Sequence, residues 1–469
     1  MKPQYLYEKL LLIVTLFTLL ISVQIWLFFD RITFKFQYLI QPFSEILDLD
    51  MFQFNFIFGI DGISIFFLVL TNLIAVFVLL VVLKSNHRCK IEYILYLASI
   101  QMILLLAFTI LDLLIFFIFF ESALIPMYIL IGKWGSRTRK IKANFYFFLY
   151  TLLGSIFLLF VIVSLYFEIG STVFCVLQNI VLDPLKIKLT WFFFFIAFAV
   201  KVPIFPFHLW LPEAHVEAPT LGSVILAALL LKLGGYGIVR ILLPCCNLMN
   251  YYYSPIVITL CLLGIIHGSL SAIRQVDIKR IIAYSSVAHM NFGILGLFSF
   301  NVEGLQGALF LMLAHGIVSA GLFFQVGTLY EKYHSKNLFY YGGLVTTMPM
   351  FSLYFMIFCF SNVGLPGSCN FIGELLIMIS LIEKNFICLF IASFSVIFSV
   401  LYTMTMCNKM IFGNIKTQYI HHWVDVNRRE HSIYVPLTLL TILFGVLPNI
   451  ILDTTFASIL FLIELHCYN

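Results

Sequence analysis

Charged residues are scarce in this 469-residue chain: Asp, Glu, Lys and Arg together make up 10% of it, against 62% hydrophobic residues. A water-soluble domain of this length needs far more charge on its surface, so the composition excludes a soluble globular protein. The formal net charge of +5 is too small to indicate a nucleic-acid-binding surface. The sequence therefore predicts an all-α protein that crosses a membrane many times.

Motifs for metals and cofactors are also missing. The ten cysteines are scattered, and none shows the C-x-x-C or His/Cys spacing of an iron–sulfur cluster or a structural zinc. The segment LGGYG lacks the G-x-G-x-x-G pattern and the βαβ setting of a dinucleotide site, and no phosphate loop or Ser/His/Asp array occurs. We expect this chain to bind no metal and no cofactor.

Hydrophobic runs long enough to cross a bilayer recur along the whole chain, and we count about 13 of them. The first run carries no signal-peptide cleavage pattern, so we expect it to be the first span. The predicted spans cover 8–29, 61–83, 91–110, 112–132, 144–168, 190–208, 220–240, 253–274, 277–298, 305–330, 348–382, 385–412 and 433–462.

Two of these spans contain helix breakers. Pro203 and Pro206 interrupt the sixth, and the Gly-Leu-Pro-Gly stretch 364–367 interrupts the eleventh, which is too long for one straight helix. Paired interruptions at corresponding places indicate two repeats of inverted topology around a transport site. The layout predicts N-terminal helices over 1–90, a first repeat over 91–274, a second over 275–412 and a C-terminal helix over 413–469.

Positive charge gathers in the even-numbered loops, which therefore share the cytoplasmic or matrix side of the membrane. The first loop, by contrast, is acidic, so the N-terminus is predicted inside and the C-terminus outside. The sixth loop, LPEAHVEAPT, is an acidic exception. The positive residues are Lys84, Arg88, Lys90, Lys133, Arg137, Arg139, Lys140, Lys142, Arg274, Lys279, Arg280, Lys416, Arg428 and Arg429.

Two lysines lie at membrane depth: Lys201 beside the prolines of the sixth span, and Lys232 in the middle of the seventh. A lysine at the centre of a membrane helix costs roughly 2.5–3.5 kcal/mol on insertion scales, so each needs a functional or structural reason. A desolvated lysine can release its proton, whereas an arginine stays charged. A buried cation beside a broken helix predicts an ion path.

Acids and histidines at the same depth complete a candidate proton relay. Glu121 is the natural partner of Lys201, and Glu374 is the corresponding acid after the second break. His208, His289 and His315 are further titratable groups, with His267 as a weaker case. The alternatives are a Glu121–Lys201 pair that only fixes helix packing, and histidines that are ordinary core residues.

The loop residues Glu213, His215 and Glu217 have two possible roles: they cap and hold the turn, or they line a proton entrance. Asp277, Lys279 and Arg280 open the ninth span, where orientation in the membrane and helix capping explain them.

Several segments identify a family. The chain resembles the subunit 4 family of proton-pumping NADH:quinone oxidoreductase (respiratory complex I), in its mitochondrial form. The segments that match are LDLLIFFIFFESALIPMYILIGKWGSR, FYFFLYTLLGS, AVKVPIFPFHLWLPEAHVEAPTLGSVILAALLLKLGGYG, DIKRIIAYSSVAHMN, LMLAHGIVSAGLF and NFIGE. The resemblance implies an antiporter-like bundle of two inverted five-helix repeats, each with one discontinuous helix.

The resemblance also implies roles for single residues. Glu121 and Lys201 match the family's ion pair, Lys232 its central lysine and Glu374 its terminal acid, where sister antiporter-like subunits have lysine. His208, His289 and His315 match the histidines of the polar axis. NADH, FMN, iron–sulfur clusters and ubiquinone are then handled by partner subunits of the inner mitochondrial membrane complex, and neighbouring antiporter-like subunits and lipids are the expected contacts of this chain.

One departure concerns the start of the chain. The family usually has one more helix, and residues 11–30 look like its second helix. We therefore expect a small membrane subunit or a separate fragment in the place of the first. The alternatives for function are a subunit of a related Na⁺/H⁺ antiporter or membrane-bound hydrogenase, and a scaffold that does not pump.

Overall fold

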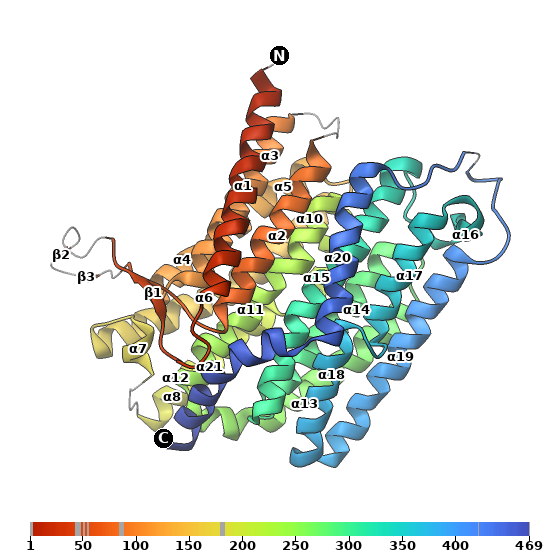
Figure 1. The fold of residues 1–469 in the computed structure, drawn as a ribbon. Helices are drawn as coiled ribbons and strands as arrows, with labels where there is room; N and C mark the ends of the chain where they lie inside the picture. Colours follow the sequence, from red (N-terminus) through yellow and green to blue (C-terminus); the bar gives the residue numbers. More distant parts are fainter. Residues whose placement is uncertain are drawn as a thin grey trace.

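The computed structural model describes residues 3–42, 48–49, 52–53, 56–83, 89–178, 183–420 and 422–468. In this part of the chain, nine helices are long and apolar enough to cross a membrane, or ten if one bent pair counts as a span. Figure 1 shows them side by side in one bundle, with the two termini at opposite ends. The chain is an all-α multi-pass membrane protein, while the count of about 13 spans stays a prediction.

The N-terminal half contains α1 (Pro3–Leu27), strands β1 (Gln37–Ile40), β2 (Asp48–Leu49), β3 (Phe52–Gln53) and β4 (Phe58–Ile60), then α2 (Ser64–Val82), α3 (Lys90–Thr109), α4 (Leu113–Ser122), α5 (Leu124–Trp134), α6 (Lys140–Ile169), α7 (Phe174–Leu177), α8 (Pro184–Lys201) and α9 (Trp210–Glu217). The strands form two short antiparallel pairs, β1 with β4 and β2 with β3.

The seventh predicted span comprises α10 (Thr220–Ile225), the π-helical turn η1 (Leu226–Leu230), α11 (Leu231–Gly237), a second π-helical turn η2 (Ile238–Leu242) and α12 (Leu243–Cys245). The rest contains α13 (Asn247–Ile273), α14 (Ile278–Leu297), α15 (Val302–Tyr333), the 3₁₀ turn η3 (Leu338–Tyr340), α16 (Leu344–Thr347), α17 (Pro349–Val363), α18 (Cys369–Lys384), α19 (Phe386–Ile411), α20 (Arg428–Val446) and α21 (Asn449–Tyr468).

The first expected break is confirmed: α8 ends at Lys201, just before Pro203 and Pro206. Proline has no N–H to donate, so the helix loses carbonyl partners at this point. Side chains replace them, as when the Trp210 indole donates to the Val200 carbonyl over 2.9 Å. The prediction of a polar turn over LPEAHVEAPT was wrong, because most of it forms the buried helix α9.

The second expected break is confirmed as well. Helix α17 ends at Val363, and α18 begins at Cys369. Gly364 and Gly367 between them have φ values of +81° and +89°, which glycine adopts without the strain of a side chain.

One helix prediction needs correction. The single span expected over 433–462 is two helices, α20 and α21, bent by 64°. Pro448 lies at the bend, where its ring is incompatible with continuing α20. The span over 112–132, by contrast, is confirmed as one candidate membrane span, Leu113–Trp134, with a local irregularity at Ala123 between α4 and α5, where Pro126 has no N–H for the carbonyl of Ser122.

The described parts of the even-numbered loops lie on one face, as their charges predicted, while Lys84 and Arg88 fall outside the described residues. The Ser136 N–H donates to the Glu217 carbonyl over 3.1 Å, and the Lys336 ammonium donates to the Ser136 hydroxyl over 2.6 Å. Glu8, near the start of α1, lies 2.9 Å from Lys90 and places the N-terminal end on the same face. Which side of the membrane this face occupies stays a prediction.

Lys279 does not belong with the loop charges. Its side chain is buried in α14, and its ammonium donates to the Ala218 carbonyl and the Ser223 hydroxyl, both over 3.1 Å. It thus ties the end of α9 to the start of α10. Counting it toward membrane orientation was wrong, because a buried lysine does not report which side a loop occupies.

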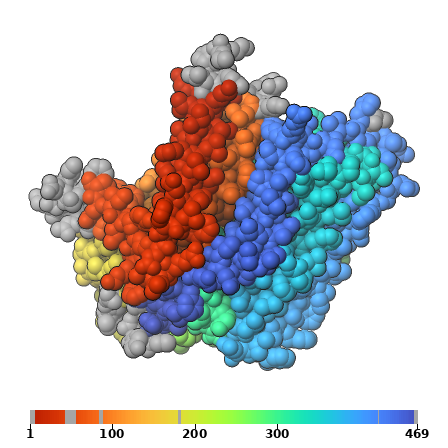
Figure 2. Space-filling model, viewed as in Figure 1, coloured from red at the N-terminus to blue at the C-terminus, as the bar shows by residue number. Residues whose placement is uncertain are grey.

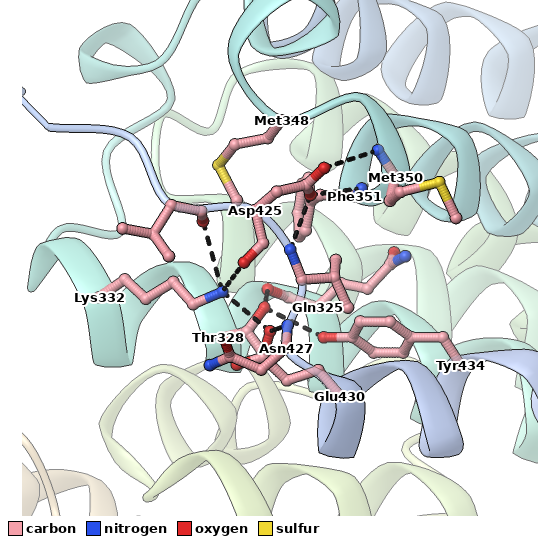
Figure 3. Close-up of polar contacts among 12 residues, drawn as sticks. Gln325, Thr328, Lys332, Met348, Met350, Phe351, Asp425, Asn427, Glu430 and Tyr434 are labelled. Carbon is pink, nitrogen blue, oxygen red and sulfur yellow. Dashed lines mark hydrogen bonds and ion pairs between the residues drawn. The ribbon is translucent and has the colours of Figure 1, made fainter.

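The segment before α20 is fixed to the loop face by a charged cluster (Figure 3). The Lys332 ammonium lies 2.8 Å from the Glu430 carboxylate and donates to the Asp425 carbonyl over 3.1 Å. The Asp425 carboxylate in turn accepts the N–H groups of Met350 and Phe351 at the start of α17. One lysine therefore connects the ends of α15, α17 and α20.

Helix α1 lies on the outside of the bundle (Figure 2), with 11% of its apolar window buried. Its contact with the bundle is partly polar: Asn72 donates to the Thr18 carbonyl over 3.2 Å, and Gln101 donates to the Asn72 side chain over 2.9 Å. Hydrogen bonds between membrane helices of this kind hold neighbours together where lipid offers no competing partner.

Two buried helical glycines differ in the space around them, so one added methyl group should have opposite effects on stability at the two positions. A Cβ at position 445 in α20 would lie 2.2 Å from the Gly367 carbonyl oxygen, whereas a Cβ at position 293 in α14 would meet nothing closer than 3.9 Å. Gly445→Ala should therefore destabilise the protein by roughly 1–3 kcal/mol through overpacking. Gly293→Ala should be neutral or stabilise it by up to about 1 kcal/mol. Thermal unfolding of the solubilised protein checks both, and equal melting temperatures for the two variants would contradict the packing at the second break.

Candidate functional site

The first part of the site is a buried pair at the end of α8. The Lys201 ammonium lies 4.0 Å from the Glu121 carboxylate, donates to the Phe120 carbonyl over 2.9 Å and sits 3.7 Å above the centre of the Phe120 ring. Two unit charges at this distance attract by about 4 kcal/mol at an effective dielectric constant near 20. The two charged groups are therefore within ion-pair distance of each other but beyond hydrogen-bond distance.

Lys232 occupies a helix that is distorted next to it. In the π-helical turn η1, the Leu231 N–H donates five residues back, to the Leu226 carbonyl. Because of this shift, the Ala227 carbonyl is available to the Lys232 side chain, whose ammonium donates a hydrogen bond to it over 2.6 Å. π-helical turns are rare and frequently mark functional positions. Here the turn supplies a backbone acceptor for a charge buried in the centre of the bundle.

A file of proton-binding groups runs from Lys232 to the second break. The Lys232 ammonium lies 2.7 Å from His315 Nδ1 on α15. The His315 and His289 rings have centroids 5.8 Å apart, and His289 Nδ1 on α14 lies 3.2 Å from the Glu374 carboxylate. All four side chains are buried. The structure therefore brings together four of the residues expected from sequence.

Glu374 lies against the backbone of the break. A Cβ at Gly364 would come within 2.6 Å of its carboxylate oxygen, so the glycine makes room for the acid as well as for the turn. Asn370, one turn before it on α18, has an amide nitrogen without a hydrogen-bond partner in the described structure. The buried Asn370 amide and the Glu374 carboxylate, both beside the interruption between α17 and α18, therefore form a polar end to this file of proton-binding groups.

The two halves of the site meet through backbone packing. A Cβ at Gly234, two residues after Lys232, would lie 3.0 Å from the Lys201 Cβ and 2.7 Å from the Val202 side chain. The glycine thus allows α11 to approach the end of α8. Lys201 and Lys232 share no hydrogen bond in the described part of the chain.

His208 lies at the first break, on the side that faces α13. Its ring is 4.8 Å from that of His267 and 5.6 Å from that of Phe205, measured between centroids. The described contacts of His208 are with these rings and not with either lysine. Both ring nitrogens are buried, and neither has a hydrogen-bond partner in the segments that the structure describes.

The three predicted entrance residues have different surroundings. The Glu213 carboxylate forms an ion pair with Arg280 over 2.7 Å. His215 is buried and stacks on Phe323 with centroids 4.8 Å apart, and neither of its nitrogens has a hydrogen-bond partner within the described part of the chain. Glu217 is also buried, with one carboxylate oxygen unpartnered. The Glu213 carboxylate is thus held in an ion pair, while His215 and Glu217 each carry a proton-binding atom without a hydrogen-bond partner among the described residues.

Lys336, in the loop after α15, is a buried cation that the sequence did not single out. Its ammonium donates to the Val216 carbonyl over 2.6 Å and lies 4.8 Å from the centre of the Tyr330 ring. Burial lowers the pKa of the Lys336 ammonium to about 8, and the Glu217 carboxylate opposes this shift. The residue therefore stays largely charged at pH 7 beside the entrance residues. No apolar run surrounds it in the sequence to mark it as buried.

A second ion pair lies at the opposite end of the Lys232 helix. Arg240 in η2 lies 2.6 Å from the Asp61 carboxylate, and its Nε donates to the Tyr236 hydroxyl over 3.2 Å. Asp61 also accepts the Ser64 N–H at the start of α2. Both charges are buried and both fall at the ends of predicted spans, where a charge is ordinarily solvated. The sequence therefore carried no sign that they pair.

The chemistry available at the site is proton exchange. Among the residues that the structure describes, no three or more His, Cys, Asp or Glu side chains are arranged to hold a metal ion. Lys232, His315, His289 and Glu374 are titratable groups that follow one another from helix to helix, and groups of this kind can pass a proton along.

Comparisons with known sequences point to one family. The model for the transmembrane region of NADH:quinone oxidoreductase and Mrp antiporter subunits matches residues 110–401. The NADH-ubiquinone oxidoreductase chain 4 of Marchantia polymorpha is 45% identical over 450 residues, which are 96% of this chain and 90% of the relative. The protein of the same name from Chondrus crispus is 42% identical over 448 residues, with the same coverage.

Solved structures agree with the sequence relatives. A chain of respiratory complex I from Thermus thermophilus superposes with a TM-score of 0.86 at 26% identity and covers 96% of this chain and 94% of its own length. A chain of the Mrp complex from Dietzia superposes with a TM-score of 0.85 at 18% identity over 97% and 92% of the two chains. The second likeness shows a shared fold.

The Asp61–Arg240 pair generates a prediction on stability. Arg240→Met should destabilise the protein by roughly 3–5 kcal/mol, because Asp61 then remains buried without its counter-charge. Asp61→Asn combined with Arg240→Met should recover part of the loss. The amount of assembled protein on a native gel and its melting temperature check both variants. A single variant as stable as the parent would show that the pair is solvated.

Proposed function

Because the chain belongs to the family of NADH-ubiquinone oxidoreductase chain 4, membrane-arm subunits of respiratory complex I, we propose that its buried file of lysine, histidine and acid translocates protons. The direct contact of 2.7 Å between the Lys232 ammonium and His315 Nδ1 supports this proposal most strongly. It joins two titratable groups at membrane depth without an intervening apolar side chain.

The first pair regulates this file. While Glu121 stays charged beside Lys201, it favours the protonated lysine; when the pair opens, the lysine releases its proton more readily. The 4.0 Å separation suits such opening, since no direct hydrogen bond must be broken. The alternative, a pair that only fixes α4 against α8, makes the same contact but predicts no effect on pumping.

From Lys232 a proton passes to His315, on to His289 and then to Glu374. The charged lysine donates to the neutral His315 Nδ1, and His289 donates to the Glu374 carboxylate over 3.2 Å. The His315 and His289 rings, with centroids 5.8 Å apart, are the neighbours across which this step occurs. Glu374 ends the file at the boundary with a neighbouring antiporter-like subunit, and His208 forms a branch toward α13.

Protons enter from the loop face through Glu217 and His215. Their unpartnered oxygen and nitrogens lie between that face and the Lys232 helix, which suits bound water at this place. Glu213 holds Arg280 at the rim.

The chain acts as one subunit of NADH:ubiquinone oxidoreductase in the inner mitochondrial membrane. NADH, FMN, iron–sulfur clusters and ubiquinone belong to partner subunits, and this chain holds no cofactor. The loop face, which carries the N-terminal end, is the matrix face, and the C-terminus lies on the intermembrane-space side. Other membrane-arm subunits and lipids surround the bundle.

A Na⁺/H⁺ antiporter subunit or a hydrogenase subunit would have the same fold. The identity of 42–45% to chain 4 proteins, against 18% to the Mrp chain, favours complex I. Copurification with flavin and iron–sulfur subunits tests the assignment. A scaffold without pumping would have no need of four buried titratable groups in contact.

Lys201 yields a prediction on activity. Lys201→Ala should leave the complex assembled and reduce proton pumping and coupled turnover at least tenfold. Lys201→Arg should fail nearly as badly, because arginine does not release its proton. Proton uptake and NADH oxidation in sealed vesicles measure both. Normal pumping by an assembled Arg variant would contradict a role for lysine deprotonation.

Glu374 yields a second prediction. Glu374→Gln removes the group that accepts a proton from His289, whereas Glu374→Asp keeps a carboxylate one carbon shorter. The glutamine variant should pump several-fold more slowly than the aspartate variant. Initial rates of vesicle acidification at equal complex content compare them. Equal and mild losses would place this acid outside the path.

A further inference from the structure

Asn291 connects the two halves of the site. It lies on α14, two residues after His289, and its side chain is fully buried. Its amide nitrogen donates to the Val287 carbonyl over 2.8 Å within α14 and to the Pro203 carbonyl over 3.2 Å. Pro203 lies in the first break, two residues after Lys201. One amide thus spans from the His289 helix to the turn beside the Lys201–Glu121 pair.

The Pro203 carbonyl needs this outside donor. In a continuous helix it would accept the Phe207 N–H, but at the break that N–H donates to the Ile204 carbonyl over 2.7 Å. A buried carbonyl without a partner is costly, so some donor must reach it. Asn291 supplies this donor from a separate helix.

The position of the Asn291 amide is fixed by its surroundings. A Cβ at Gly264 on α13 would lie 2.6 Å from the Asn291 oxygen, so the side chain occupies a notch that only glycine leaves open. Two carbonyls face the amide nitrogen, which identifies it as the NH₂ group. The Asn291 oxygen has no hydrogen-bond partner in the described structure.

We propose that Asn291 is a positioning residue for proton transfer. Its hydrogen bond fixes the end of α8 against α14 and thereby maintains the distance between Lys201 and Glu121. In the proposed function, His289 exchanges protons on the same helix as Asn291. This inference rests on the proposed function. It adds a hydrogen-bonded link between the two half-sites, which also pack together where Gly234 meets Val202 and Gly237 meets Phe198.

The test uses the whole complex in sealed vesicles and compares Asn291→Leu with Asn250→Leu. The leucine has a similar volume but no donor. Asn250 is the matched control, since it is equally buried and donates to the Leu243 carbonyl over 2.8 Å, away from the break. Both variants should lose thermal stability. Only Asn291→Leu should lower the number of protons pumped per electron, at least twofold, and shift the pH profile of coupled turnover.

Equal proton-to-electron ratios and pH profiles in the two variants would overturn the positioning role. If Asn291→Leu does not assemble, Asn291→Ala and Asn250→Ala allow the same comparison with the same criterion. Lys232→Met separates this inference from the proposed function. Normal pumping by that variant would refute the function itself, whereas loss of pumping there with normal pumping by Asn291→Leu would refute only the role of Asn291.

Discussion

The structure depends on one constraint: a backbone polar group at membrane depth must find a partner within the protein, because lipid offers none. Prolines and glycines interrupt α8–α9 and α17–α18, and each interruption frees carbonyls that a regular helix would use. The Trp210 indole and the Asn291 amide occupy two of them at the first break. The π-helical turn beside Lys232 frees another, which the lysine itself occupies. The functional groups and the backbone defects are therefore found together.

Much of this arrangement could be read from sequence because the signals were local. A lysine or glutamate inside an apolar run is conspicuous, so Glu121, Lys201, Lys232 and Glu374 could be named in advance. Proline and glycine act on their own residue and its near neighbours, so both breaks could be placed. These inferences need no knowledge of how helices are rotated against one another.

What the sequence did not show depends on packing between distant segments. The LPEAHVE stretch was interpreted as a turn because it is polar, yet Arg280 pairs with its Glu213 from another helix. In the sequence, Lys279 resembles an exposed loop charge, and only the packing of α14 against α9 and α10 shows that its side chain is buried. That Lys232 meets His315, rather than another of the histidines, follows from the rotation of α15, which no pattern in one helix determines.

The outer helices of the bundle separate the helices that carry Lys232 and His315 from the lipid. Every residue in the apolar window of the Thr220–Cys245 segment is buried, as is every residue in that of α15, whereas the windows of α1, α6 and α19 are 11%, 39% and 22% buried. The helices that carry Lys232 and His315 thus have protein on all sides. Changes in bilayer thickness act first on the outer helices, which can tilt to match them. The inner helices form an insulated core, so the spacing between Lys232 and His315 is buffered from the composition of the surrounding membrane.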